Sequence, residues 1–321
     1  MKKRRIIIIV IAAVCMIAAI LSVCLVVIAR RNKDTGLGVD TNFTIEDTLP
    51  DGEGRRATVI FLAGQSNASG CSRDEYLKKN VSQEKYSEYE RGYDNVYINY
   101  FATGTNRSDG FVRCGKEQGE AGGFFGPELG LAESLSAKYP DRTFFIIKYA
   151  WGGSNLYGQW RSPSAFGKTG ELYDAFVKYA NMSIEYITSK NYDVRIEGMC
   201  WMQGESDSIG KENAKAYEKN LTKFIKDVRG EFSTYAAEDG IAFIDAYIAE
   251  NASYWIHYEI VNECKKQVAA ASDLNSVIDT VSAGLTCQAE PEGEPDLAHY
   301  DSLSQIKLGH LFAEELERFL D

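Results

Sequence analysis

A short polar turn after an apolar run is the first place in this sequence where chemistry could occur. Residues 57–63 are mostly apolar and rich in β-branched side chains, which predicts a buried strand, and Gly64-Gln65-Ser66-Asn67 follows directly. In α/β proteins the chain leaves the sheet at such a strand end, and backbone N–H groups of the turn point outward. We therefore interpret Ser66 as a nucleophile. The alternative is an ordinary turn, because Gly, Ser and Asn are common turn residues.

A serine nucleophile needs a base and a group that orients the base, and Asp296-x-x-His299 offers both. The other two of the three histidines are His257, which lies among aromatic residues, and His310, which lies in an expected helix. His299 instead stands in a polar turn, three residues after a carboxylate. This spacing allows Asp296 to hold Nδ1 of His299 while Nε2 faces Ser66. A purely structural Asp–His cap is the alternative.

Acyl transfer also needs hydrogen-bond donors for the oxyanion. We expect these donors to be the backbone N–H groups of Ser66 and Gly153 and the side-chain amide of Gln203. Each follows or ends a predicted strand, and glycine allows the close backbone approach that such a pocket requires. Glu205 is open to three interpretations: a second orienting carboxylate, a substrate contact, or a buried structural acid.

The elements that must position these residues follow from hydrophobic periodicity. Strands are predicted at residues 57–63, 95–101, 143–150, 196–203 and 241–247. Helical patterns cover residues 129–135, 172–187, 217–228, 257–272 and 305–320. This alternation predicts a mainly parallel sheet with helices on both faces. Ser66, Gly153 and Gln203 then fall at strand ends, and Asp296 and His299 fall just before the last helix. Residues 71–93 and 104–123 lack a clear period and are predicted to be loops that shape a substrate cleft.

Five short blocks of the sequence, in this order, resemble those of the SGNH hydrolase superfamily. They are Gly64-Gln65-Ser66-Asn67, Phe125-Gly126-Pro127-Glu128-Leu129-Gly130, Gly152-Gly153-Ser154, Gln203-Gly204-Glu205-Ser206-Asp207 and Asp296-x-x-His299. More narrowly, they resemble the sialate O-acetylesterase and carbohydrate esterase family 6 group, over residues 57 to 320. One departure is Ser154, which stands where Thr is usual and keeps the hydroxyl.

The resemblance implies a flavodoxin-like three-layer α/β/α fold and removal of acetyl groups from carbohydrate hydroxyls, without a metal or other cofactor. It carries the nucleophile onto Ser66, the base onto His299, the orienting acid onto Asp296 and oxyanion roles onto Gly153 and Gln203. The identity of the acetylated sugar does not carry over. Two other functions stay open: an acetyltransferase that modifies a cell-surface polysaccharide, and a catalytically silent carbohydrate-binding protein.

Two other hydrolase classes fit the sequence poorly. The nucleophile elbow of α/β-hydrolases is G-x-S-x-G, whereas Ala68 occupies its last position here, and those enzymes place several strands before the nucleophile. A metal hydrolase is disfavoured because three scattered histidines offer no ligand cluster.

The N-terminus predicts a membrane anchor. Lys2-Lys3-Arg4-Arg5 precedes an uncharged run over residues 6–29, long enough to span a bilayer as a helix. The basic cluster places the N-terminus in the cytoplasm and the body outside. A cleaved signal peptide is the alternative and would make the protein secreted. Residues 30–56 are polar and glycine-containing and predict a flexible tether, followed by an esterase domain over residues 57–321.

The net charge limits the classes of partner that this protein can bind, and the cysteine count limits its disulfide bonding. The net charge of −11 is uneven: residues 1–33 hold seven basic residues and no acid, which leaves 28 basic against 46 acidic residues, or −18, in the rest. A body this acidic is a poor partner for nucleic acid. Five of the seven cysteines lie outside the apolar run, and an odd number argues against a complete disulfide framework.

Overall fold

The computed structural model describes residues 37–103 and 106–320 of the chain. The predicted anchor at residues 6–29 and the first part of the tether lie outside these ranges. Across the residues described, no helix combines the length and the apolar character needed to cross a bilayer.

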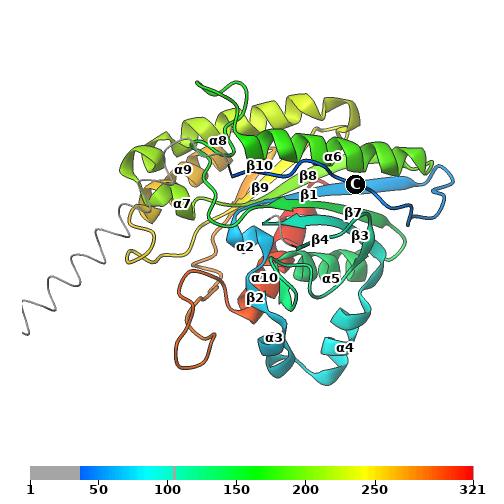
Figure 1. Cartoon of the computed structure of the whole chain (residues 1–321), viewed down its shortest axis with the longest axis horizontal. Helices are drawn as coiled ribbons and strands as arrows, with labels where there is room; N and C mark the ends of the chain where they lie inside the picture. Colours follow the sequence, from blue (N-terminus) through cyan, green and yellow to red (C-terminus); the bar gives the residue numbers. More distant parts are fainter. Residues whose placement is uncertain (1–36, 104–105, 321) are drawn as a thin grey trace, which may run out of the picture. The chain divides into compact units, whose positions relative to one another are not determined.

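A mainly parallel sheet forms the centre of the described fold (Figure 1). Its strands run in the spatial order β10 (Asn275–Ile278), β9 (Ala242–Ala246), β8 (Asp193–Met202), β1 (Arg56–Gly64), β7 (Thr143–Ala150), β3 (Tyr93–Ala102) and β4 (Asn106–Arg107), with β5 (Val112–Cys114) also paired to β3. The pairs from β10 to β3 are all parallel, whereas β4 and β5 run antiparallel to β3. Parallel strands buried on both faces explain the apolar runs in the sequence.

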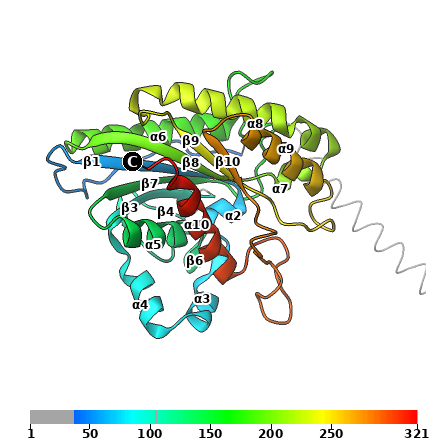
Figure 2. The same ribbon diagram turned by 180° about the vertical axis from the view of Figure 1, so that it is seen from behind.

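Helices cover both faces of the sheet, as Figures 1 and 2 show. The helices α6 (Glu171–Ser189) and α8 (Lys211–Glu231) lie on one face, and α9 (Tyr258–Ala270) packs beside α8. The helices α5 (Glu128–Lys138) and α10 (Ser302–Leu316) pack together on the other face. This is the expected arrangement of three layers around a mainly parallel sheet.

Large aromatic side chains fill the core between the sheet and helices α6 and α8. The rings of Trp160 and Trp201 meet edge to face at 5.2 Å, and Phe224 of α8 lies 4.6 Å from Trp201. Phe61 of β1 packs edge to face on Phe176 of α6 at 5.4 Å. Burial of this aromatic surface anchors the two long helices, which carry one apolar stripe each.

The five predicted strands and five predicted helices are all present, with ends that differ by a few residues. Pro127 precedes α5 immediately, as expected for a helix start. Strand β10 was not predicted, because its four residues, Asn275–Ile278, are half polar and too short to show a period.

The prediction that residues 71–93 form a loop is wrong. This segment contains β2 (Ser72–Arg73), which pairs with β6 (Phe124–Phe125), and the helices α3 (Asp74–Asn80) and α4 (Gln83–Arg91). Helix α4 begins with a capping bond, because the Ser82 side chain accepts from Lys85 N. Its buried tyrosines keep polar partners: Tyr86 donates to Asp74 at 2.6 Å and Tyr89 to Glu133 at 2.7 Å. The buried face of this helix is formed by tyrosine rings. In a segment otherwise rich in Lys and Glu, the sequence therefore shows no clear helical period of apolar residues.

The tether predicted over residues 30–56 needs correction in its second half, which packs on the domain. Leu49 is buried, and the ring of Phe43 lies 5.4 Å from Phe101 and 5.0 Å from Tyr179. The hydroxyl of Tyr186 accepts from the backbone N–H groups of residues 48 and 49. Two apolar side chains among polar neighbours are enough to hold this segment, and a composition-based prediction of flexibility misses them.

Candidate active site

Three loops leave the sheet at the same level. In the strand register Gly64, the last residue of β1, stands opposite Ala150 of β7 and Met202 of β8. The backbone extends this alignment by one residue, because Trp151 N donates to Gly64 O at 3.0 Å and Gln65 N to Met202 O at 2.9 Å. The turns that carry Ser66, Gly153 and Gln203 therefore begin side by side at the carboxyl ends of adjacent parallel strands.

The turn that carries Ser66 requires glycine at position 64. Gly64 has φ 142°, and a Cβ there would lie 1.9 Å from the carbonyl oxygen of Met202. The turn continues into the short helix α2 (Ser66–Ser69), so Ser66 is its first residue and is 9% exposed. Gln65 fixes the turn, since its Oε1 accepts from Gly204 N at 3.3 Å and Ser206 N at 3.2 Å.

Asp207 joins the second and third loops. It lies in the short helix α7 (Glu205–Ser208) and is fully buried. Its carboxylate accepts from Leu156 N at 2.7 Å and from Tyr157 N at 2.9 Å. Burial raises the pKa of Asp207 to about 6, although these hydrogen bonds oppose the rise. Asp207 is thus a structural acid that holds the loop after β7.

The loop after β7 presents Gly153 at an open position. Gly153 has φ 68°, which favours glycine, and no atom would lie within 4 Å of a Cβ there. The neighbouring Ser154 hydroxyl is turned inward, where it donates to Trp151 O at 2.6 Å and accepts from Trp160 Nε1 at 2.8 Å. Ser154, which stands where Thr is usual, therefore uses its hydroxyl to support the loop.

His299 and Asp296 form a pair. Nδ1 of His299 lies 2.6 Å from Oδ2 of Asp296, and Asp296 also accepts from Ala298 N at 3.0 Å. Burial works against ionisation of Asp296, but its contacts with His299 hold its pKa below the usual range. With Nδ1 held by the carboxylate, Nε2 of His299 is the nitrogen left for proton transfer.

Asn67 connects the turn that carries Ser66 to the loop that carries His299. Its Oδ1 accepts from Tyr300 N at 3.1 Å, and its Nδ2 lies 3.4 Å from Ala298 O. Its own carbonyl accepts from Gln305 Nε2 of helix α10 at 2.6 Å. Ser66 and His299 are each adjacent in sequence to one end of this connection, so the Asn67 bonds hold the two loops that carry them to each other.

The carboxylate of Glu205 contacts Asn67, whereas the carboxylate that contacts His299 is that of Asp296. The Oε1 of Glu205 accepts from Asn67 Nδ2 at 2.9 Å, and its Oε2 is buried without a hydrogen-bond partner among the described residues. Burial raises the pKa of Glu205, partly offset by the Asn67 hydrogen bond. Of the three interpretations of this residue, a buried structural acid is the one these contacts favour.

Gln203 is fully buried, and its side-chain amide already has partners. Nε2 lies 2.7 Å from Asp207 Oδ2, 3.1 Å from Ser154 O and 3.2 Å from Gln65 Oε1, while Oε1 accepts from Tyr217. Because an amide nitrogen carries two hydrogens, an oxyanion role for Gln203 requires one of these contacts to be exchanged.

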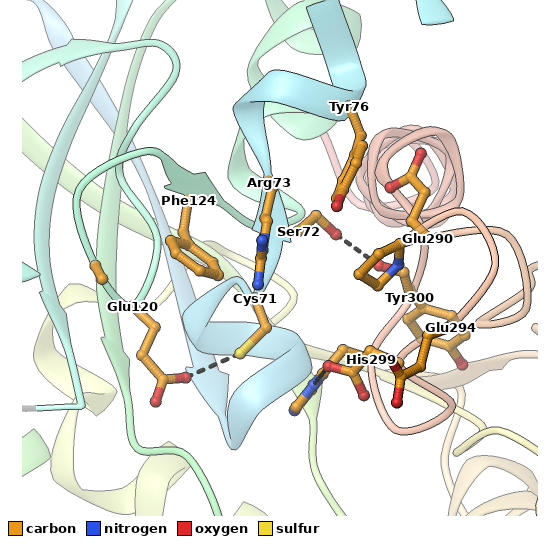
Figure 3. Close-up of a pocket in the computed structure, with 13 residues that line it drawn as sticks. Cys71, Ser72, Arg73, Tyr76, Glu120, Phe124, Glu290, Glu294, His299 and Tyr300 are labelled. Atoms are coloured by element: carbon orange, nitrogen blue, oxygen red, sulfur yellow. Dashed lines mark hydrogen bonds and ion pairs between the residues drawn. The ribbon is translucent and has the colours of Figure 1, made fainter. Parts of the chain in front are cut away.

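A cavity of about 610 Å³ lies beside the histidine loop (Figure 3). His299 and Asp296 line it on one side, and Cys71 and Glu120 on another. The thiol of Cys71 lies 2.9 Å from Glu120 Oε2, and burial together with Glu120 raises the thiol pKa well above its usual value. The cavity volume lies within the range of small-molecule binding sites.

Sequence reasoning did not single out Asn67 or Glu120 as site residues. Asn67 is the last residue of the Gly64-Gln65-Ser66-Asn67 block, and nothing in the sequence pairs it with Tyr300, 233 positions away. Glu120 lies in a loop without a period. The five cysteines of the described ranges are free thiols, and the described residues contain no group of three or more His, Cys, Asp or Glu arranged to hold a metal ion.

Solved structures share this architecture. A protein from Arabidopsis thaliana matches with a TM-score of 0.58 at 18% identity, covering 82% of this chain and 99% of its own. NanS matches with a TM-score of 0.58 at 14% identity, covering 85% and 99%. A carbohydrate acetylesterase from Xanthomonas citri matches with a TM-score of 0.53 at 16% identity, covering 82% and 56%. No match was found among curated proteins.

These likenesses establish the fold class, a three-layer α/β architecture that is consistent with the SGNH-type fold. The family follows from a protein-family comparison that matches residues 56–318, nearly all of the described chain. The chain belongs to the carbohydrate esterase family described as sialic acid-specific acetylesterase. It is accordingly a carbohydrate esterase.

Proposed function

We propose that this protein removes O-acetyl groups from carbohydrates with Ser66 as nucleophile, His299 as general base and Asp296 as the acid that orients His299. The observation that supports this most is the hydrogen-bonded pair of His299 and Asp296, joined to the Ser66 turn through Asn67. The Ser66 turn and the Asp296–His299 loop, which are far apart in sequence, are linked in this way beside the edge of the sheet where α/β proteins carry chemistry.

In the first half of the reaction, Nε2 of His299 takes the proton from the Ser66 hydroxyl as its oxygen attacks the acetyl carbonyl carbon. The resulting oxyanion accepts hydrogen bonds from the backbone N–H groups of Ser66 and Gly153. The amide of Gln203 joins them if it releases one of its present acceptors. Collapse of the intermediate breaks the bond to the sugar oxygen, and His299 returns the proton to that oxygen.

In the second half, a water molecule attacks the acetyl group on Ser66, with His299 as base again. The same donors stabilise the second oxyanion, and its collapse releases acetate and restores the Ser66 hydroxyl. Asp296 keeps Nδ1 of His299 protonated throughout and stabilises the imidazolium that forms twice per turnover.

The test is acetate release from 4-nitrophenyl acetate and from an acetylated sugar, with Ser66→Ala beside the unchanged protein. We expect Ser66→Ala to lose several orders of magnitude in kcat with an unchanged far-UV spectrum. Ser69→Ala is a matched control, because Ser69 lies in the same short helix and is fully buried, but its hydroxyl lies 3.2 Å from Gln65 O and 3.3 Å from Thr103 Oγ1. Near-normal activity of folded Ser66→Ala would remove Ser66 from the mechanism.

Transfer of the acetyl group to a sugar hydroxyl is the second function that the same serine allows. It differs from hydrolysis only in the acceptor that reaches acetyl-Ser66. Adding an acceptor sugar to the assay separates the two: a transferase gives an acetylated acceptor at the expense of free acetate, whereas an esterase gives acetate alone.

We also propose that the enzyme acts outside the cytoplasm, held by the apolar run at residues 6–29. Protease added to intact cells would degrade the domain in that arrangement, and a domain that stays intact until the cells are lysed would contradict it.

A further inference from the structure

The cavity beside His299 is bordered by segments from two distant parts of the chain. The strand β2 and the loop at residues 120–124 form one side, and the loop at residues 290–300 forms the other. Figure 3 shows the side chain of Glu120 on the first side, and those of Glu290 and Glu294 on the second. A ligand in this cavity therefore lies between carboxylates.

The lining carries more negative than positive charge. Its carboxylates are Glu120, Glu290, Glu294 and Asp296, and its basic side chains are Arg73 and His299. Glu290 accepts from Ser302 N at 2.7 Å and from Asn80 Nδ2 at 2.8 Å, and neither of these donors carries a charge. Walls of one sign of charge focus the field inside a cleft, so the cavity opposes an anionic ligand.

Glu120 lies beside the proposed oxyanion loop. A Cβ on Gly152 would lie 3.0 Å from Oε1 and 3.1 Å from Oε2 of Glu120, and the same carboxylate contacts Cys71 at 2.9 Å. Backbone bonds fix its position, because Glu120 N donates to Gly70 O at 2.9 Å. Gly152 directly precedes Gly153, whose N–H is a proposed oxyanion donor, so this charge lies beside the loop that would hold the acetyl group.

Arg73 does not offset these acids on its own. Its guanidinium lies 5.7 Å from the centroid of the Phe124 ring and 6.0 Å from that of Tyr76. It also lies 3.4 Å from Glu75, so part of its charge is directed toward a carboxylate outside the cavity. The two aromatic rings offer apolar surface for the face of a sugar ring.

We propose that the cavity selects neutral acetylated sugars over anionic ones, and that Glu120 is the residue that determines this specificity. This proposal rests on the proposed esterase function and specifies its substrate class. The carboxylate of Glu120 accepts hydrogen bonds from sugar hydroxyls and repels a substrate carboxylate.

The test compares an O-acetylated sialate with the methyl ester of its own carboxylate, following acetate release only. The two compounds have the same ring and acetyl group and differ in charge, so their kcat/KM ratio isolates the electrostatic effect. We expect the neutral ester to be favoured by about tenfold or more at low ionic strength, within the range of electrostatic focusing. The preference should shrink at about 0.5 M salt, where screening acts within a few ångströms.

Glu120→Gln removes the charge and keeps the size and a hydrogen-bond acceptor. We expect the neutral-to-anionic ratio to fall by about tenfold in this variant. Glu212→Gln is the matched control, because Glu212 is an exposed carboxylate on α8 outside the cavity, and its ratio should stay unchanged. Because the readout is a ratio within each protein, a general loss of activity does not affect it.

The outcomes separate this inference from the function it rests on. Equal or faster hydrolysis of the anionic sialate by the unchanged protein overturns the specificity proposal, and so does a ratio that Glu120→Gln leaves unaltered. If neither sialate nor 4-nitrophenyl acetate releases acetate, the esterase function itself fails.

Discussion

Asn67 Oδ1 accepts a hydrogen bond from Tyr300 N at 3.1 Å, and this bond spans 233 positions of the sequence. It joins the turn that carries Ser66 to the loop that carries His299. The other end of the Asn67 amide donates to buried Glu205 at 2.9 Å. In the proposed mechanism, the alignment of Ser66 with His299 therefore depends on the side chain of Asn67, which takes no part in bond making.

Asn67→Ala should lower kcat on 4-nitrophenyl acetate by about 100-fold, because a small displacement of a base relative to its nucleophile is costly. The measurement is kcat and KM, together with urea unfolding. Asn99→Ala is the matched control, since Asn99 is also fully buried and bonded to Ser183, Ser108 and Tyr179, but lies within strand β3. It should lose comparable stability and little kcat. Equal loss of kcat in the two variants would mean that Asn67 acts only through stability.

Asp296→Asn and Glu205→Gln should differ strongly in activity. Asp296 contacts His299 directly at 2.6 Å, and loss of an orienting carboxylate costs about 10⁴-fold in kcat in a serine protease. Glu205→Gln keeps an oxygen for the Asn67 amide, so we expect a loss below about tenfold. Both variants are assayed on one acetyl ester after their folding has been checked. Greater damage in Glu205→Gln would assign the orienting role to Glu205 and leave the Asp296 contact a structural cap.

The sequence predicted the parts of the fold that depend on periodicity and strand ends. The strand ends that carry Ser66, Gly153 and Gln203 are predicted by periodicity, and the register brings the loops at those ends together. It could not predict what depends on contacts between distant segments. The pairing of Glu205 with Asn67, the partners of the Gln203 amide and the position of Glu120 all arise from side chains that meet only after folding.

The segment before β1 should contribute to stability although its composition resembles a tether. Leu49 is 4% exposed, and truncating such a buried side chain costs about 2–5 kcal/mol. We expect Leu49→Ala to lower the free energy of unfolding of a chain starting at Leu37 by that amount. Asn42→Ala, at an exposed neighbouring position, should change it by less than about 0.5 kcal/mol. Equal urea midpoints for both variants would show that residues 42–49 do not hold to the domain in solution.

The buried acid Asp207 should make stability fall as pH rises through the weakly acidic range. Its pKa is about 6 in the folded protein, raised by burial from the ordinary 3.8, so the folded state keeps a proton that the unfolded chain has released. Stability from this group is therefore full below about pH 4, declines up to about pH 6 and is constant above it.

Asp207→Asn removes this titration while disturbing the bonds to Leu156 and Tyr157 at every pH. Between pH 4 and 7, the stability advantage of the unchanged protein over Asp207→Asn should shrink by about 2.5 kcal/mol, most of the value of the shift in pKa, because the unfolded carboxyl is already partly ionised at pH 4. Urea unfolding at pH 4, 5, 6 and 7 measures it. Asp279→Asn is the control: hydrogen bonds from Ser282 lower the pKa of Asp279, so its contribution is lost only as pH falls below the ordinary range and stays nearly constant over this interval. Parallel curves for the unchanged protein and Asp207→Asn would show that Asp207 is already ionised at pH 4 and is held by charge-assisted hydrogen bonds.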